Sequence, residues 1–188
     1  MLNNVTRRQG ENTTMKRSTL IASFFTLAVV LLSGCAVTDV HRSQQLDASA
    51  RWALLPIANY AETPQAGERA EAILTTLLHK QGVSQLTAAP RSNNGGLPEF
   101  DQAAALDQAI SWARNQGYRY GVTGAVEEWQ YKTGLDGEPA VGISLRVIDV
   151  NTGATVWSAS GSKAGWGYAT VSGTAQKLMS GLVGDMPL

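Results

Sequence analysis

The sequence predicts a single α/β (α+β) domain in which helices pack on one mixed sheet, in the order β-α-β-α-β-β-β-α. Three segments carry apolar residues at the three- and four-residue spacing of an amphipathic helix. Apolar residues alternate with small or polar ones over residues 141–147, which is the period of a half-buried strand. About 135 residues follow an N-terminal export signal, and that length is sufficient for one hydrophobic core.

The chain begins with the pattern of an exported lipoprotein. Met15-Lys16-Arg17 is a short basic start, and residues 19–32 are almost wholly apolar. This apolar run is shorter than the roughly 20 residues of a membrane-spanning helix. It ends in Leu32-Ser33-Gly34-Cys35, which resembles a bacterial lipobox. We therefore expect residues 1–34 to be a lipoprotein signal peptide, with Met15 as an alternative start, and Cys35 to carry the lipid.

Lipidation would use the only cysteine and would hold the mature protein at a membrane, because several acyl chains together anchor stably. Ala36 follows Cys35, in place of the Asp that retains lipoproteins in the inner membrane of enteric-type bacteria. The periplasmic leaflet of the outer membrane is therefore the expected location. Residues 36–50 are polar and aperiodic, so we expect residues 35–50 to be a lipidated tether before one domain at residues 51–188.

Charge argues against one class of function. The whole chain has 15 basic and 15 acidic residues, whereas a nucleic-acid-binding protein normally carries a basic excess. The expected signal peptide contains four of the basic residues and one of the acidic residues, so 11 basic and 14 acidic residues remain, a net charge of −3. The mature protein is mildly acidic, which suits a cationic partner.

The first half of the domain has the pattern of two strand–helix units. Residues 51–60 form an apolar run that is typical of a buried strand, and Pro64 and Gly82 mark the start and end of a helix. One face of this helix is apolar: Ala70, Ile73, Leu74, Leu77 and Leu78. The opposite face is charged: Glu68, Arg69, Glu71 and Lys80. A short strand at 83–86 and a loop at 88–98 precede a second helix at 101–116.

The second half has the pattern of three strands and a helix. We expect strands at 118–130, 141–147 and 155–159, joined by turns at 135–139 and 151–153. A glycine-rich loop is expected to follow: Gly161, Gly165 and Gly167. The last helix has one apolar face: Val171, Ala175, Leu178, Met179, Leu182 and Val183.

The sequence contains no arrangement that indicates catalysis, a metal or a cofactor. His41 falls in the expected tether and His79 on the polar edge of the first helix, where no third group would orient the imidazole. The glycines match neither phosphate-binding nor dinucleotide-binding motifs. Glu127 and Glu128 are adjacent in a strand, so we expect their side chains on opposite faces, where they cannot form an acid–base pair.

Trp166 has an unusual setting, because Gly165 and Gly167 flank it and Tyr168 follows. Glycines on both sides leave little local structure to bury the indole. An exposed amphipathic ring suits the headgroup region of a membrane or a subunit interface. A position in the domain core is the alternative. We expect Trp166 and Tyr168 to face the membrane.

Several motifs together resemble the PelC family, the outer-membrane lipoproteins of the Pel exopolysaccharide export system. The motifs are RWALLP at 51–56, PQAGERA at 64–70, VTG at 122–124, VEEWQYK at 126–132, GLDGEPAVG at 134–142, AGW at 164–166, AQK at 175–177 and LVGD at 182–185. They cover nearly the whole mature domain. Residues 83–100 carry no distinctive match.

The resemblance implies a fold similar to the N-terminal domain of TolB and to curli secretion lipoproteins. It further implies a twelve-subunit ring on the periplasmic face of the outer membrane, which guides the cationic Pel polysaccharide to a PelB-type porin. The Trp of the Ala-Gly-Trp motif faces the membrane in the family, and here it is Trp166. Four acidic residues are candidates for contact with the polysaccharide or between ring subunits: Asp136, Glu138, Glu127 and Glu128.

Two other functions remain open from the sequence. One is a TolB-like periplasmic lipoprotein that docks on a cell-wall synthase and activates it. The other is a periplasmic hydrolase, which would depend on carboxylates such as Glu128 or Asp136.

Overall fold

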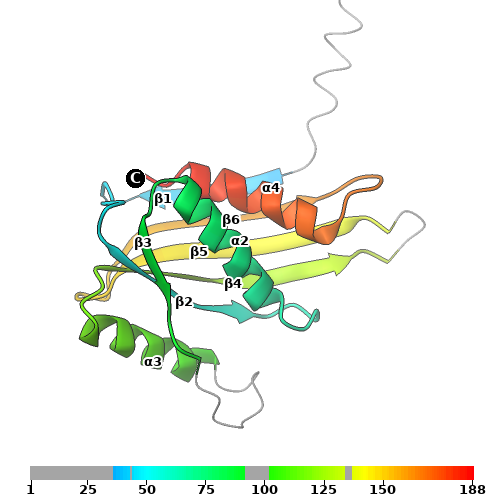
Figure 1. Cartoon of the computed structure of the whole chain (residues 1–188). Helices are drawn as coiled ribbons and strands as arrows, with labels where there is room; N and C mark the ends of the chain where they lie inside the picture. Colours follow the sequence, from blue (N-terminus) through cyan, green and yellow to red (C-terminus); the bar gives the residue numbers. More distant parts are fainter. Residues whose placement is uncertain (1–35, 43, 92–101, 134–136) are drawn as a thin grey trace, which may run out of the picture. The chain divides into compact units, whose positions relative to one another are not determined.

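A six-stranded mixed sheet with helices on both faces organises the residues described by the computed structural model, which are 36–42, 44–91, 102–133 and 137–188 (Figure 1). In order across the sheet, the strands are β1 (Ala36–Arg42), β6 (Thr155–Ala164), β5 (Pro139–Asp149), β4 (Tyr120–Tyr131), β2 (Arg51–Asn59) and β3 (Gln85–Ala88). Strand β2 runs parallel to β3 and β4, and the other neighbouring pairs are antiparallel. The predicted mixed α/β architecture is confirmed.

Helices α2 (Ala66–Lys80) and α4 (Val171–Gly184) cover one face of the sheet and enclose the larger hydrophobic core. The expected apolar face of α4 is wholly buried, and that of α2 is buried except for Ile73, which is partly buried. Thr170 caps α4, because its Oγ1 accepts a hydrogen bond from the Gly173 amide at 3.1 Å. The hydrophobic period of each helix therefore determines which face it buries.

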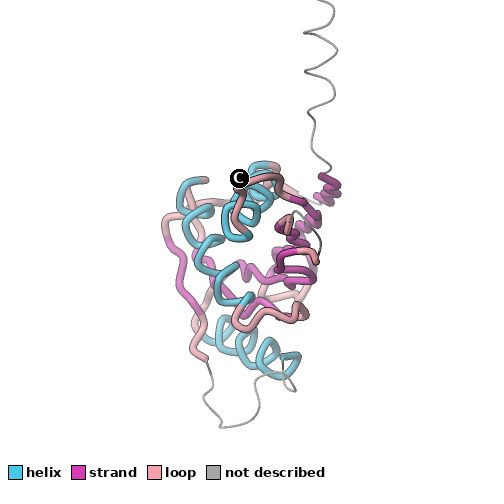
Figure 2. The backbone as a smooth tube through the Cα atoms, turned by 90° about the vertical axis from the view of Figure 1, so that its right-hand side faces the viewer, coloured by secondary structure: helices cyan, strands magenta, loops and turns pink. Residues whose placement is uncertain are grey.

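Helix α3 (Gln102–Asn115) lies apart from α2 and α4, on the opposite face of the sheet beside β2 (Figures 1 and 2). It encloses a second, smaller core with Ala53 and Leu55 of β2 and Ile148 at the end of β5. Since α3 covers only this corner, the same face of β4, β5, β6 and β1 carries no helix of the described chain. This open face becomes important below.

The N-terminal segment differs from the expected tether. Residues 36–42 form β1, which pairs antiparallel with β6 from Ala36 opposite Lys163 to Arg42 opposite Trp157. The connection to β2 is also fixed, because Leu46 is only 3% exposed and its amide donates to the Pro187 carbonyl at 2.8 Å. The folded unit therefore begins at Ala36, and the expectation of a free polar linker up to residue 50 is wrong.

Three smaller expectations also change. Gly161 lies inside β6 and not in a loop, because β6 continues to Ala164. The second strand lies two residues later than expected, at Gln85–Ala88. Glu71 was expected on the solvent face of α2, but its side chain is only 14% exposed. These differences arise from contacts between elements that are distant in the sequence.

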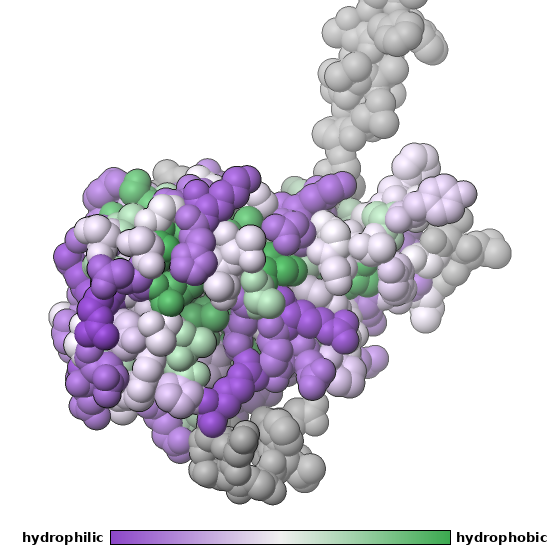
Figure 3. All heavy atoms as spheres, in the orientation of Figure 1, coloured by the Kyte–Doolittle hydropathy of each residue, from purple (hydrophilic) through white to green (hydrophobic). Residues whose placement is uncertain are grey.

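The face that carries α2 and α4 is mostly hydrophilic and is interrupted by small apolar patches (Figure 3). The indoles of Trp52, Trp129 and Trp157 are buried in the core beneath it.

None of the helices in the described segments is long and apolar enough to cross a membrane.

Candidate functional site

Three exposed aromatic side chains lie at one end of the sheet, and two of them, Trp166 and Tyr168, are those that the sequence singled out. Trp166 is 81% exposed and Tyr168 is fully exposed, both in the connection between β6 and α4. Tyr131, at the end of β4, is 53% exposed. The β4–β5 and β6–α4 connections leave the sheet at this same end (Figure 1). We call these three side chains the aromatic end.

Two glycines hold the Trp166 loop in its shape. The Gly165 amide donates to the Pro139 carbonyl at 2.7 Å, and a Cβ at position 165 would lie 2.5 Å from Pro139 Cγ. Gly167 has a φ of 61°, a conformation that L side chains rarely adopt. The loop is therefore packed tightly against the start of β5, while its indole stays in solvent. The core position for Trp166 is excluded, and its membrane role stays a prediction.

The first described residue, Ala36, lies near the aromatic end. Cys35 lies outside the described residues, as does the whole expected signal peptide. Its covalent neighbour Ala36 is opposite Lys163, and Ala164 is opposite Ala140 at the start of β5. The first residue of β1 therefore pairs with the end of β6, the strand that leads directly into the loop that carries Trp166.

The four acidic candidates do not form one cluster. Asp136 lies outside the described residues. Glu138 is half-buried in the β4–β5 connection near the aromatic end, and its carbonyl accepts from the Lys132 amide at 2.7 Å. Glu127 and Glu128 lie further along β4, where they flank Gly142 of the neighbouring strand.

Glu127 and Glu128 share one face of the sheet, contrary to expectation. The β4–β5 register shifts between Val126 and Glu128, so Glu127 is an extra residue in a β-bulge. A Cβ built on Gly142 would lie 3.6 Å from the Glu127 Cβ and 3.5 Å from the Glu128 Cβ. We expected strand alternation to separate Glu127 and Glu128 and so to prevent an acid–base pair, and that argument is therefore wrong. Both carboxylates already accept hydrogen bonds, Glu127 from Ser144 at 2.8 Å and Glu128 from Gln130 at 3.2 Å.

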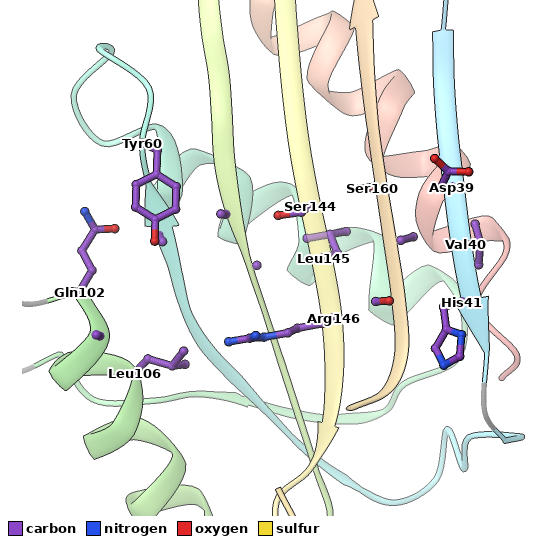
Figure 4. Close-up of a pocket in the computed structure, with 16 residues that line it drawn as sticks. Asp39, Val40, His41, Tyr60, Gln102, Leu106, Ser144, Leu145, Arg146 and Ser160 are labelled. Carbon is purple, nitrogen blue, oxygen red and sulfur yellow. The ribbon is translucent and has the colours of Figure 1, made fainter. Parts of the chain in front are cut away.

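The open face of the sheet forms a groove of about 690 Å³. In Figure 4, Tyr60 and Gln102 lie on one side of it and Asp39 and His41 of β1 on the other, while Arg146 reaches from β5 toward α3. Strand pairing places Ser158 beside Arg146 and Ser160 beside Ser144. We call this site the open-face groove.

Sequence reasoning missed the open-face groove for a physical reason. Asp39 and His41 were assigned to a tether, and Ser144 and Arg146 were read only as the polar phase of an alternating strand. The groove exists because β1 pairs with β6 and because α3 covers only one corner of the face. Neither fact is visible in local sequence.

Neither histidine belongs to a metal-binding cluster in the described residues, because no three His, Cys, Asp or Glu side chains there are placed to hold an ion. Nδ1 of His79 lies 2.8 Å from the Val83 carbonyl, a contact that closes the end of α2. His41 lines the open-face groove.

Comparison with solved structures identifies the family. A PelC dodecamer from Paraburkholderia phytofirmans is 38% identical to this chain, with a TM-score of 0.67 over 79% of this chain and 95% of that one. The chain belongs to the PelC family. A second PelC dodecamer structure from the same organism matches at 38% identity and a TM-score of 0.66, over 78% and 96% of the two chains.

More distant structures share the fold. Lipoprotein GNA1162 from Neisseria meningitidis is 20% identical, with a TM-score of 0.52 over 72% of this chain and 96% of that one. No protein-family model matches the chain, and a search of curated proteins gives no match. PelC membership therefore rests on the structural matches at 38% identity, and it agrees with the motifs found in the sequence.

Proposed function

We propose that this chain is an outer-membrane lipoprotein subunit of a ring that assists export of the cationic Pel exopolysaccharide. In this proposal acylated Cys35 anchors each subunit in the periplasmic leaflet, and the ring guides the polymer to a PelB-type porin without making or breaking a bond. Membership of the PelC family is the observation that carries the proposal, because both matched structures of PelC from Paraburkholderia phytofirmans are dodecamers.

The placement of the aromatic end supports membrane anchoring. The acyl chains on Cys35 would enter the bilayer next to Ala36. Ala36 pairs with the end of β6, and β6 leads directly into the Trp166 loop. Trp and Tyr rings favour the headgroup region, where the ring is partly desolvated and its polar atom stays hydrated. Trp166 and Tyr168 are exposed in the position that this arrangement requires.

Charge supports the choice of polymer. The mature chain carries a net charge of −3, and a closed ring multiplies that charge around one opening. Many screened contacts lower the energy of a cationic chain, while each contact is weak enough to let the chain slide. Asp136, Glu138, Glu127 and Glu128 are the proposed acidic contacts with the polymer or between subunits.

The decisive experiment measures the mass of the full-length lipoprotein in detergent and polymer secretion in a deletion strain. We expect a closed oligomer about twelve times the mass of one subunit, and loss of secreted Pel that the wild-type gene restores. A monomer in detergent, together with normal secretion after deletion, would overturn the proposal. Capture of a cell-wall synthase in that case would establish the adaptor function instead.

A further inference from the structure

We propose that the open-face groove binds a segment of a saccharide that bears both amino and acetylated amino groups. This inference rests on the proposed function and deepens it, because it gives the polymer a binding site on each subunit. The groove is distinct from the aromatic end, and Glu127 borders it, because the Glu127 carboxylate accepts a hydrogen bond from the Ser144 hydroxyl at 2.8 Å.

The floor of the groove is low and polar. Across it, Asp39, Ser160 and Ser144 lie side by side on β1, β6 and β5, and His41, Ser158 and Arg146 form the adjacent row. At about 4.8 Å between strands, the floor from β1 to β2 extends over roughly 19 Å. Its volume of about 690 Å³ is within the range of small-ligand sites, roughly 300–1,000 Å³.

Small side chains keep this floor low, and packing within the sheet requires one of them, because a Cβ on Gly124 would lie 2.0 Å from the Ser144 carbonyl oxygen. Gly142 lies two residues before Ser144 on β5, outside the lining of the groove, and a Cβ there would lie 3.5 Å from the Glu128 Cβ and 3.6 Å from the Glu127 Cβ. Glycine weakens a strand, and within strands it often marks the close approach of a ligand or a backbone. The alanine opposite Ser144 on β4, Ala125, likewise keeps the floor low.

The chemistry of the groove fits a hydroxyl-rich chain of mixed charge. Serine hydroxyls both donate and accept hydrogen bonds, as sugar hydroxyls do. The Asp39 carboxylate can accept from an ammonium group, and the Arg146 guanidinium can donate to the carbonyl oxygen of an acetylated amine. Asp39 in the groove and Glu127 beside it outnumber the Arg146 guanidinium, so formal charge favours a chain with a net positive charge and disfavours a polyanion.

Arg146 and Tyr60 supply the directional contacts. Neither side chain has a hydrogen bond or ion pair within the described part of the chain, so both are available to a ligand. Tyr60 is 69% exposed at the rim, where its ring can cover the apolar face of a sugar while its hydroxyl stays in water. Gln102 is less available, because it exchanges hydrogen bonds with the Asn59 backbone at 2.8 and 3.2 Å.

Calorimetric titration of the full-length lipoprotein in detergent tests the site. The probe is a partly N-acetylated hexosamine pentasaccharide, and an uncharged glucose pentasaccharide is the comparison. We expect only the hexosamine to bind measurably. Arg146→Ala and Asp39→Ala should each weaken binding about tenfold, because each removes one charge-assisted hydrogen bond. Ser160→Tyr should abolish it by filling the floor.

Matched controls lie outside the groove. Ser180→Tyr adds the same ring to the exposed face of α4, and Arg69→Ala removes an exposed guanidinium from α2. Both should bind like the wild type, and all five variants should keep the wild-type oligomer mass and melting temperature. Absence of hexosamine binding by the wild type, or equal binding by the Ser160→Tyr and Ser180→Tyr variants, would overturn the inference.

One further outcome separates this inference from the proposed function. If Ser160→Tyr breaks up the oligomer, the groove is an interface with a second copy of the chain and the saccharide site is wrong. If the wild type forms a ring and supports Pel secretion, but groove variants secrete normally, the proposed function stands and the groove inference fails.

Discussion

Pro56 interrupts β2 in its interior, and two side chains from neighbouring elements complete the hydrogen bonding there. Proline has no N–H, and the register between β2 and β4 shifts between Leu54 and Ile57. The Ile57 amide donates to Glu71 Oε1 at 3.0 Å, and Thr123 Oγ1 donates to the Pro56 carbonyl at 2.6 Å. These two partners come from α2 and β4, so the apolar run at 51–60 does not by itself show how the strand accommodates Pro56.

Glu71 accepts a hydrogen bond at this register shift, and its ionisation makes the free energy of unfolding depend on pH. Burial raises the pKa of its carboxyl, although the Ile57 amide and the paired Arg91 guanidinium act in the opposite direction. A raised pKa in the folded state means that folding favours the protonated form. This contribution to stability is therefore lost as pH rises from the ordinary range of a Glu side chain through the raised pKa.

Replacing Glu71 by Gln should remove this pH dependence. Gln keeps an oxygen to accept from Ile57 but cannot ionise, so the variant should gain stability relative to the wild type as pH rises. Glu71→Ala should instead cost about 1–3 kcal/mol, because the Ile57 amide loses its partner. Urea unfolding at several pH values measures both effects.

The control is Glu68→Gln, which removes the other carboxylate that pairs with Arg91, at 2.7 Å, in an exposed position. The Glu68 variant should retain the Glu71-dependent slope of stability against pH. Parallel curves for the wild type and Glu71→Gln would contradict the assigned role of Glu71.

At the scale of elements, local pattern predicted the helices and the inner strands well. The apolar stripes of α2 and α4 identify their buried faces because period and burial are coupled in a helix. The alternation of Val141, Ile143 and Leu145 likewise identifies the helix-facing side of β5. In the candidate site, local sequence also predicted that Trp166 is exposed, because flanking glycines leave its indole without neighbouring side chains to cover it.

Strand β1 and the β-bulge at Glu127 could not be predicted in this way. β1 lies at the edge of the sheet, so it has few buried side chains and a weak pattern. Its place depends on β6, which is more than a hundred residues away. The bulge depends on the register of β4 against β5. The open-face groove could therefore not be predicted from the sequence, because residues of β1 line one side of it.

Gly161 should be essential for docking of β1. A Cβ at this position would meet the Val37 carbonyl oxygen at 2.7 Å and Thr38 Cγ2 at 3.0 Å, so an added methyl must displace the β1 backbone. We expect Gly161→Ala to lower stability by about 1–3 kcal/mol and to expose the β1 amides to hydrogen exchange. Mass spectrometry of exchange in the peptide spanning residues 36–42 measures the second effect.

Gly181→Ala is the matched control for that substitution. Gly181 lies in α4 with no atom within 4 Å of an added Cβ, so alanine should stabilise the helix by up to about 1 kcal/mol. If the β1 amides stay protected in Gly161→Ala, β6 does not hold β1 through this close approach.

For the molecule as a whole, the pairing of β1 with β6 changes how the proposed lipid anchor would act. A polar tether of about fifteen residues would let the domain tumble freely below the membrane. With β1 in the sheet, Cys35, the residue proposed to carry the lipid, is bonded directly to a strand whose partner leads into the Trp166 loop. In the proposed arrangement, lipid and aromatic rings would act at the same end of the sheet, so the strands would point toward the bilayer with the open-face groove along their length.

This arrangement predicts a second membrane contact that does not need the lipid. A Cys35→Ser form of the mature chain should bind vesicles of outer-membrane phospholipids weakly. Trp166→Ala should reduce that binding about tenfold, because burying a large aromatic ring contributes more than 1 kcal/mol. The same substitution should change unfolding free energy by less than about 0.5 kcal/mol, since the side chain is 81% exposed. Tyr60→Ala removes an exposed ring from the groove and should leave vesicle binding unchanged. Unfolding of the Trp166→Ala domain, or equal vesicle binding by both variants, would exclude a membrane-facing Trp166.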